Sequence, residues 1–549
     1  MKGFRIRRTF QGTLFSGIAL AVVGCSTRPD RAGEPREAEL ARRAESAPGV
    51  ASSADVALPA NGRQLFESYC AICHGLSGDG RGEASWMLSP APRDFTSGRF
   101  RLVSTANGIP SDEDLVATLR RGMPGSAMPA WEWMSAAELA ALATYVRELA
   151  YEGMTKSLLA WAETEGEDLS EDEARALARE KTTPGPKLEL GAPPAGSEGM
   201  LAHGKELYTV SCASCHGADG RARNVENQVN EDGTPTRPQD YTAGIFKGGG
   251  EREDIVRRLL CGIPGSPMPQ TEFADPRDPW ALASYVRTFV KPGVEERVLQ
   301  HRKTLRARRV AALPRDPLDP AWAEVESTWI ALMPLWWRDE RIEGLELSAV
   351  HDGREIAFHL AWADATKSEE LLGFETFTDA AALQFSAEAT PPFFAMGEAG
   401  RPLNIWSWKA AWELEGEQAR GIADRYPFAS DTLPAYVPED MRQLYSTARA
   451  AGNDLAAPGH ARPVEELSAQ GFGTLAPVSR KGGLAGHGVW SEGRWQVVFT
   501  RPLRPEGTEL VPFEPGTEVC VGYAVWDGSA QDRNGQKSVS VWHCLEIER

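Results

Sequence analysis

Cys70-Ala71-Ile72-Cys73-His74, and later in the chain Cys212-Ala213-Ser214-Cys215-His216, set the organisation of the first half of this sequence. Cys-x-x-Cys-His is the attachment signature of c-type haem. Two intervening residues on a helical turn separate the thiols by the spacing of two haem vinyl groups, and the histidine then faces the iron. A redox pair or half a zinc site would use similar cysteines, but two copies without a βαβ context favour haem. We therefore expect two covalent haem c groups.

The two motifs lie inside a longer repeat. Gly62 recurs as Gly204, and the block 125–129 (Gly-Ser-Ala-Met-Pro) recurs as 265–269 (Gly-Ser-Pro-Met-Pro). In total, six blocks recur in the same order. In five of them the two copies lie 140 or 142 residues apart. A duplicated domain of about one hundred residues has the size of an independent folding unit.

The repeated Met-Pro loop supplies the candidate sixth iron ligands. Met128 and Met268 occupy the same position in the two copies, and flanking prolines would stiffen the loop. Methionine opposite histidine raises the potential of a haem. Met123 is a rival for Met128, but its counterpart in the second copy is Ile263, so the repeat favours Met128.

Each copy resembles a class I cytochrome c domain, over residues 57–152 and 199–292. The matching features are an opening helix, the haem motif, the Met-Pro loop and a closing helix with Tyr-Val-Arg (145–147 and 285–287). The resemblance implies an all-α fold around each haem. It also implies two filled axial positions, and therefore electron transfer rather than substrate binding.

From residue 322 onward the sequence changes to a strand pattern. Apolar residues alternate with polar ones over 345–349 and 356–360 around the turn pair Asp352-Gly353, and again over 495–500, 518–526 and 538–547. We expect an all-β sandwich over residues 322–549. The predicted fold class is thus multidomain, with two all-α cytochrome c domains and a C-terminal all-β sandwich.

Several blocks of this region resemble the haem b subunit of the ethylbenzene dehydrogenase group, the γ subunits of type II dimethyl sulfoxide reductase-family molybdoenzymes. They lie at 379–385, 392–410, 493–503, 524–528 and 535–542. The resemblance implies a β-sandwich that holds one non-covalent haem b between a methionine, here Met396, and a lysine, here Lys537. The rival ligands are Lys409, Lys481, His543 and His487.

The remaining segments indicate export. Residues 1–25 carry a basic start, a short apolar run and Gly24-Cys25, which resembles a lipoprotein signal with Cys25 as the lipidated residue. Residues 26–56 are expected to be a flexible tether, and residues 153–198 and 293–321 to be linkers. The predicted location is periplasmic, lipid-anchored to a bacterial membrane. A formal net charge of -18 argues against a nucleic-acid partner.

These features together predict an electron carrier and not a catalytic subunit. The γ-subunit resemblance implies a molybdoenzyme or its iron–sulfur subunit as one redox partner, and a soluble cytochrome or terminal oxidase as the other. Two alternatives stay open at this point. One is a haem enzyme acting on a small inorganic substrate, and the other is a redox sensor with a ligand-binding β domain.

Overall fold

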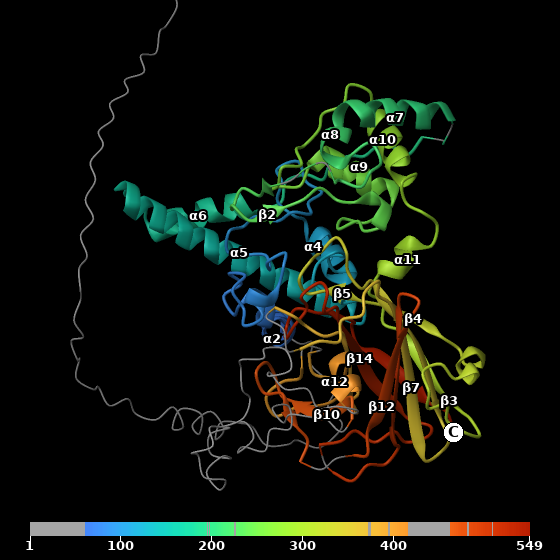
Figure 1. The fold of residues 1–549 in the computed structure, drawn as a ribbon. Helices are drawn as coiled ribbons and strands as arrows, with labels where there is room; N and C mark the ends of the chain where they lie inside the picture. The colour runs from blue at the N-terminus through green and yellow to red at the C-terminus, as the bar shows by residue number, and fades with distance from the viewer. Residues whose placement is uncertain are drawn as a thin grey trace, which may run out of the picture. The chain divides into compact units, whose positions relative to one another are not determined.

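The computed structural model describes residues 61–549 except 195, 197, 224, 226, 372–374, 394–395, 416–461, 480–481 and 508. The predicted signal, tether and Cys25 lie outside the described residues, and so does Lys481. Helices make up the first part of the described chain and strands the second (Figure 1). This confirms the multidomain fold class. Within the described ranges, no helix has both the length and the apolar character that a bilayer span requires.

The first repeat domain is helical throughout. Its elements are α2 (Gly62–Tyr69), α3 (Ala71–His74), η1 (Ser85–Met87), α4 (Asp112–Arg121) and α5 (Ala136–Glu165). Capping boxes begin α4 at Ser111 and α5 at Ser135, so serine and acidic side chains satisfy the first free N–H groups of both helices. The closing helix α5 extends into the predicted linker and lies side by side with α6 (Glu171–Thr182) (Figure 1).

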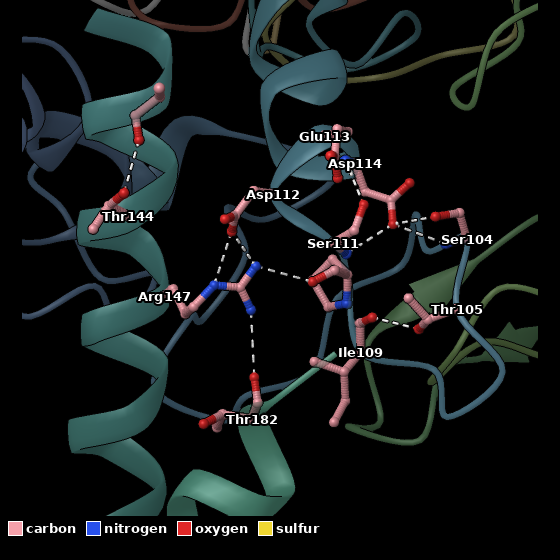
Figure 2. A network of polar contacts seen from close by, with 12 residues as sticks. Ser104, Thr105, Ile109, Ser111, Asp112, Glu113, Asp114, Thr144, Arg147 and Thr182 are labelled. Carbon is pink, nitrogen blue, oxygen red and sulfur yellow. Dashed lines mark hydrogen bonds and ion pairs between the residues drawn. The ribbon is translucent and has the colours of Figure 1, made fainter. Parts of the chain in front are cut away.

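Arg147 of the Tyr-Val-Arg block joins three of these helices. Its guanidinium donates to Asp112 Oδ1 from Nε (3.0 Å), to Pro110 O (3.1 Å) and to Thr182 O (3.4 Å). Figure 2 shows this side chain reaching from α5 to the start of α4 and to the end of α6. Asp114, beside it, accepts from Ser104 N (2.9 Å) and so fixes the preceding loop. These contacts hold the closing helix α5 in place against α4 and α6.

The second repeat domain has the same order of helices. Its elements are α7 (Glu198–Ser211), α8 (Ala213–His216), β1 (Gln228–Val229), β2 (Pro235–Thr236), η2 (Tyr241–Ala243), α9 (Arg252–Cys261) and α10 (Asp278–Arg287). In both copies, the glycine of the opening helix meets a backbone carbonyl of the closing helix. A Cβ on Gly62 would overlap Ala141 O, and a Cβ on Gly204 would overlap Ala281 O. Glycine therefore permits the helix crossing in each domain.

The rest of the described chain is mostly strand. After α11 (Val294–Val298) its elements are β3 (Thr304–Arg309), η3 (Pro320–Glu324), β4 (Thr328–Ala331), β5 (Met333–Pro334), β6 (Gly344–His351), β7 (Glu355–Ala363), β8 (Ala380–Ser386), β9 (Leu403–Lys409), α12 (Ala410–Glu415), β10 (Val464–Ala469), β11 (Ala476–Pro477), β12 (Ala485–Ser491), β13 (Arg494–Pro502), β14 (Glu518–Trp526), β15 (Ser538–Val539) and β16 (His543–Ile547).

One large sheet folds over on itself to enclose the β core. Its strand order is β11-β10-β9-β8-β14-β16-β3-β6-β7-β13-β12. Aromatic side chains from the two halves meet inside, for example Phe358 of β7 against Trp406 of β9, with ring centroids 5.6 Å apart. Strand β3 lies in the segment predicted as a linker, and it pairs in parallel with both β16 and β6. Its alternating burial, with Leu305 and Ala307 inside, explains how a basic segment enters the sheet.

A buried ion pair lies in this core. Arg501 and Glu466 are 2.8 Å apart, and their side chains are 0% and 3% exposed. Arg501 also donates to Asn404 Oδ1 (2.8 Å) and to the carbonyl of Val511. The pair joins β13 to β10 across the two halves of the sheet.

Candidate haem sites

The first haem motif opens onto a large apolar cavity. Cys70, Cys73 and His74 line it together with Met123 and Met128, and it has ≈ 1380 Å³ of empty space, part of which is open to solvent. Apolar side chains of α2, α4 and α5 and residues of the loop at 88–102 form most of its other walls, and residues from the rest of the chain complete them. A cavity of this size and character suits a flat, largely apolar macrocycle.

The ring of His74 is held in the orientation that an iron ligand needs. Its Nδ1 lies 2.9 Å from the carbonyl of Arg93, which can only accept, so Nδ1 carries the proton and Nε2 keeps its lone pair. Phe95 stacks on the imidazole with ring centroids 4.4 Å apart. Burial lowers the pKa of His74 to about 4, so the ring is neutral at pH 7, as iron binding requires.

The Met-Pro loop is closed by the same short bonds in both copies. Met123 N donates to Met128 O (3.0 Å), and Ile263 N donates to Met268 O (3.1 Å). A serine hydroxyl also braces each loop from within. Ser126 donates to the carbonyl of Met123 (2.7 Å), and Ser266 donates to the carbonyl of Ile263 (2.8 Å). Met123 and Met128 both line the first cavity, so Met128 as the ligand stays a prediction.

The second motif differs at the residue that stacks on the histidine. His216 Nδ1 lies 3.2 Å from the Gln239 carbonyl, which matches the first copy. Tyr241 replaces Phe95; its ring centroid is 4.6 Å from that of His216, and its hydroxyl lies 3.2 Å from Nε2. Iron bound at Nε2 therefore requires this hydroxyl to turn to another acceptor. The repeat aligns the two rings, in Asp-Phe-Thr at 94–96 and Asp-Tyr-Thr at 240–242, but their stacking on the histidines was not predicted.

In the β region, Lys537 lies beside the indole of Trp526, and Met396 packs on an apolar cluster that this tryptophan also contacts. Met396 packs on the same apolar cluster as Trp526, on the face formed by β8, β9, β10 and β14. Its φ of 72° is a strained value for a residue with a side chain, and such strain is common at ligand sites. Lys537 Nζ lies 4.8 Å from the Trp526 ring centroid. Burial lowers the pKa of Lys537 to about 8, which favours the neutral amine that can bind iron.

The rival ligands have different surroundings. Lys409 Nζ lies 4.2 Å from the ring centroid of Trp412. His487 is exposed, and its Nδ1 lies 3.0 Å from Glu413. His543 is buried, and its Nδ1 accepts from Lys303 N (3.1 Å). Because Nδ1 accepts this bond, the proton of the neutral ring lies on Nε2, which has no hydrogen-bond partner among the described residues, so His543 offers iron no free lone pair in this arrangement. The pair Met396 and Lys537 stays a prediction.

Family comparisons divide the chain in the same way. Residues 57–146 match the cytochrome c oxidase cbb3-type subunit III family, and residues 201–289 match the cytochrome c family. Residues 319–449 and 471–538 match the ethylbenzene dehydrogenase family.

Individual relatives match over two fifths of the chain. The haem subunit assigned to respiratory nitrate reductase in Haloferax mediterranei is 26% identical over 42% of this chain and 67% of its own length. The chlorate reductase gamma subunit of Ideonella dechloratans is 26% identical over 41% and 76%, and the dimethylsulfide dehydrogenase gamma subunit of Rhodovulum sulfidophilum is 26% identical over 42% and 73%. A chain of the reducing HAO-like complex of Kuenenia stuttgartiensis is 29% identical over 43% of this chain and 98% of that one, with a TM-score of 0.36.

Proposed function

We propose that this electron carrier, built of two cytochrome c domains and one ethylbenzene dehydrogenase-type domain, relays electrons between a molybdenum oxidoreductase-type complex and a respiratory cytochrome. Two haem c groups and one haem b would carry the electrons. The relatives named above are haem or gamma subunits of reductases and a dehydrogenase, which supports a partner of that kind. The observation that carries the proposal is the contact of the β domain with the first haem cavity.

The loop of Met396 reaches that cavity directly. Phe393, three residues earlier, lines the cavity of the first haem motif. It stacks on Trp131 of the first cytochrome c domain, with ring centroids 6.3 Å apart and planes 23° apart. Trp542 Nε1 donates to the neighbouring Pro392 carbonyl (2.8 Å) and ties this loop to the β domain. One candidate ligand of haem b is therefore three residues from a wall of the haem c site.

Lys537 is connected to the same domain by a second route. Leu335 N donates to Lys537 O (2.9 Å), and Leu335 O accepts from Ser89 N of the first domain (2.9 Å). Leu335 also packs beside Met87 and Cys73 in one apolar cluster. Both candidate ligands of haem b thus lie close to the first haem c, on two separate paths.

The second cytochrome c domain contacts the first one and also the β region, where Arg237 pairs with Asp339 (2.7 Å), but among the described residues no hydrogen bond or ion pair joins it to Met396 or Lys537. Arg121 Nε donates to the carbonyl of Lys247 (3.1 Å), and Lys247 itself lines the first haem cavity. Arg258 donates to the carbonyl of Arg101 (3.4 Å). We therefore place the first domain in the middle of the relay, in the order haem b, first haem c, second haem c, although it comes first in the sequence.

The proposed location is outside the cytoplasm, with Cys25 carrying a lipid that anchors the chain to a bacterial membrane. Covalent haem c supports export, because c-type haem is attached outside the cytoplasm, and the basic and apolar residues before Cys25 support a lipoprotein signal. Mass spectrometry of the mature N-terminus tests this part. A Cys25→Ser variant recovered in the soluble fraction would support the anchor, and unchanged membrane association would oppose it.

A pyridine haemochrome spectrum before and after acid-acetone extraction tests the haem content. We expect two covalent haem c groups and one extractable haem b per chain. Lys537→Leu should abolish the extractable haem, because leucine fills the space without offering iron a ligand. Lys409→Leu is the matched control, because Lys409 has the same charge and a similar aromatic contact, and it should keep the haem. A wild-type chain without extractable haem would remove haem b from the proposal and leave the haem c carrier.

Carbon monoxide separates the carrier from the two alternatives, an enzyme and a sensor. Haems with two protein ligands should show no spectral change, whereas an open iron would bind the gas. The relay order has its own test. After a reducing pulse, a Cys70→Ala/Cys73→Ala chain should exchange electrons between haem b and the second haem c at least tenfold more slowly than wild type. An unchanged rate would contradict the middle position of the first domain.

A further inference from the structure

Three aspartates meet at one end of the β domain, and one of them, Asp527, lines the same small pocket as Lys537. Asp364 directly follows β7, Asp379 directly precedes β8, and Asp527 directly follows β14. Strands β8 and β14 are antiparallel with Ala380 opposite Trp526, so the next residues, Asp379 and Asp527, face each other at the same edge. One carboxylate oxygen from each of the three lies within 4.8 Å of the other two.

Asp379 is fixed at the centre of this cluster. It is 0% exposed, and it accepts from Ser368 N (2.7 Å), Trp495 Nε1 (2.9 Å) and Gly528 N (2.8 Å). Gly528 can take this position only because it has no side chain. A Cβ there would overlap the carbonyl of Phe377. These bonds orient the carboxylate before any ligand arrives.

Asp364 supplies an independent sign of a ligand. Its side chain is buried, with the residue only 5% exposed, and Oδ1 accepts from Thr366 N (3.0 Å). Oδ2 is buried and has no hydrogen-bond partner among the described residues. A buried carboxylate oxygen without a partner is costly unless something positive binds it.

Charge repulsion within the cluster also indicates that something positive binds there. Burial, and then the negative charge of Asp364, raise the pKa of Asp379 to about 7, even though its three hydrogen bonds act in the opposite direction. Burial also raises the pKa of Asp364, with a further contribution from Asp527. A bound cation or a bound proton would relieve this repulsion.

We propose that Asp364, Asp379 and Asp527 bind one Ca²⁺ ion. An all-oxygen set of carboxylates is typical of hard divalent cations. No two of the three ligand atoms are more than 4.8 Å apart, so one ion at a Ca²⁺–oxygen distance of about 2.4 Å could lie between any two of them. Mg²⁺ would keep several of its waters, and two almost fully buried carboxylates leave little room for them.

The ion would fasten the folded sheet at this end. β7 belongs to one half of the sheet, whereas β8 and β14 belong to the other half. Asp527 is the partly exposed member, so Ca²⁺ enters from its side and solvent completes the coordination there. The site holds the two halves together without touching the haem ligands.

Calorimetric titration of the full haem-loaded chain, first stripped with a chelator, tests the proposal with Ca²⁺ itself. We expect one Ca²⁺ per chain, and at about 100 times the dissociation constant a rise in the Tm of the β domain of roughly 5–10 °C. Asp364→Asn should abolish both effects. Asp168→Asn, at an exposed position outside the β domain, is the control for charge and should change neither.

If Asp364→Asn fails to fold, Asp527→Asn provides the second variant, because this side chain is less buried. A wild-type chain that binds no Ca²⁺, or a Ca²⁺ response that survives in the folded variant, would overturn the proposal and indicate a shared proton. An equal response to Mg²⁺ would overturn the assignment to calcium.

Discussion

The buried pair of Arg501 and Glu466 gives a sharp prediction for the stability of the β domain. Arg501→Met removes the guanidinium from Glu466, from Asn404 and from the Val511 carbonyl. Glu466 is then left with Gly482 N (2.8 Å) and an indole N–H (3.2 Å) as donors, at a position that stays shielded from water. Removing one member of a buried pair costs about 3–5 kcal/mol.

Differential scanning calorimetry of the haem-loaded chain measures this loss. A domain of this size loses about 2–4 °C of Tm per kcal/mol, so the β transition should fall by roughly 6–20 °C. Arg501→Met/Glu466→Gln should recover at least about 1 kcal/mol, because no unpaired charge stays buried.

Arg504, which lies three residues after Arg501, provides a matched control. It pairs with Glu514 at 2.6 Å, but the two side chains are 72% and 41% exposed. Arg504→Met should therefore cost no more than about 1 kcal/mol. Equal losses for the two arginine variants would refute the reasoning that burial, and not the pair itself, sets the energy.

Further changes test the helical domains and the response to acid. Gly62→Ala pushes a methyl group against the Ala141 carbonyl, and thermal unfolding should show a loss of about 1–3 kcal/mol, more than the ~1 kcal/mol of added helix propensity. Met128→His should lower the midpoint potential of one haem c in a spectroelectrochemical titration, whereas Met123→Leu should not, and the reverse would exchange their roles. Burial lowers the pKa of His359 to about 4, below the unfolded value near 6.5. The neutral buried ring therefore contributes fully to the free energy of unfolding above pH 6.5, and this contribution is lost as the pH falls to 4. Urea denaturation across this interval should show a loss on the order of 2–3 kcal/mol that is smaller in His359→Gln.

The helices and several strands could be predicted from the sequence because their signals are local. An opening helix was predicted for each repeat, and α2 and α7 are these helices. The alternation over 518–526 corresponds to β14 in full. Strand β3 was missed because only Leu305 and Ala307 face the core, between arginines that look like a solvated linker. Its partners lie far along the chain, and no local pattern reports parallel pairing.

The same difference between local and long-range signals separates the sites that sequence can predict from those that it cannot. Each cysteine motif holds its chemistry within five residues, so sequence alone is enough to predict where both haem c groups attach. The aspartates at 364, 379 and 527 are brought together only by the register of β8 with β14 and by the fold of the sheet. Each one looks like an ordinary polar residue at a strand end. The same limit applies to Phe393, whose place in the haem cavity depends on the packing of two domains.

The position of β3 between β6 and β16 has a consequence for how the protein is made. β3 is synthesised more than two hundred residues before β16, its parallel partner. At about 5–20 residues per second the ribosome needs roughly 10–50 s to cover that distance, and the sheet stays open at its centre until then. Both cytochrome c domains have left the ribosome by that time and can fold first. Because haem c is attached only after export, we expect an exported chain truncated before β16 to receive both haem c groups without a complete sheet.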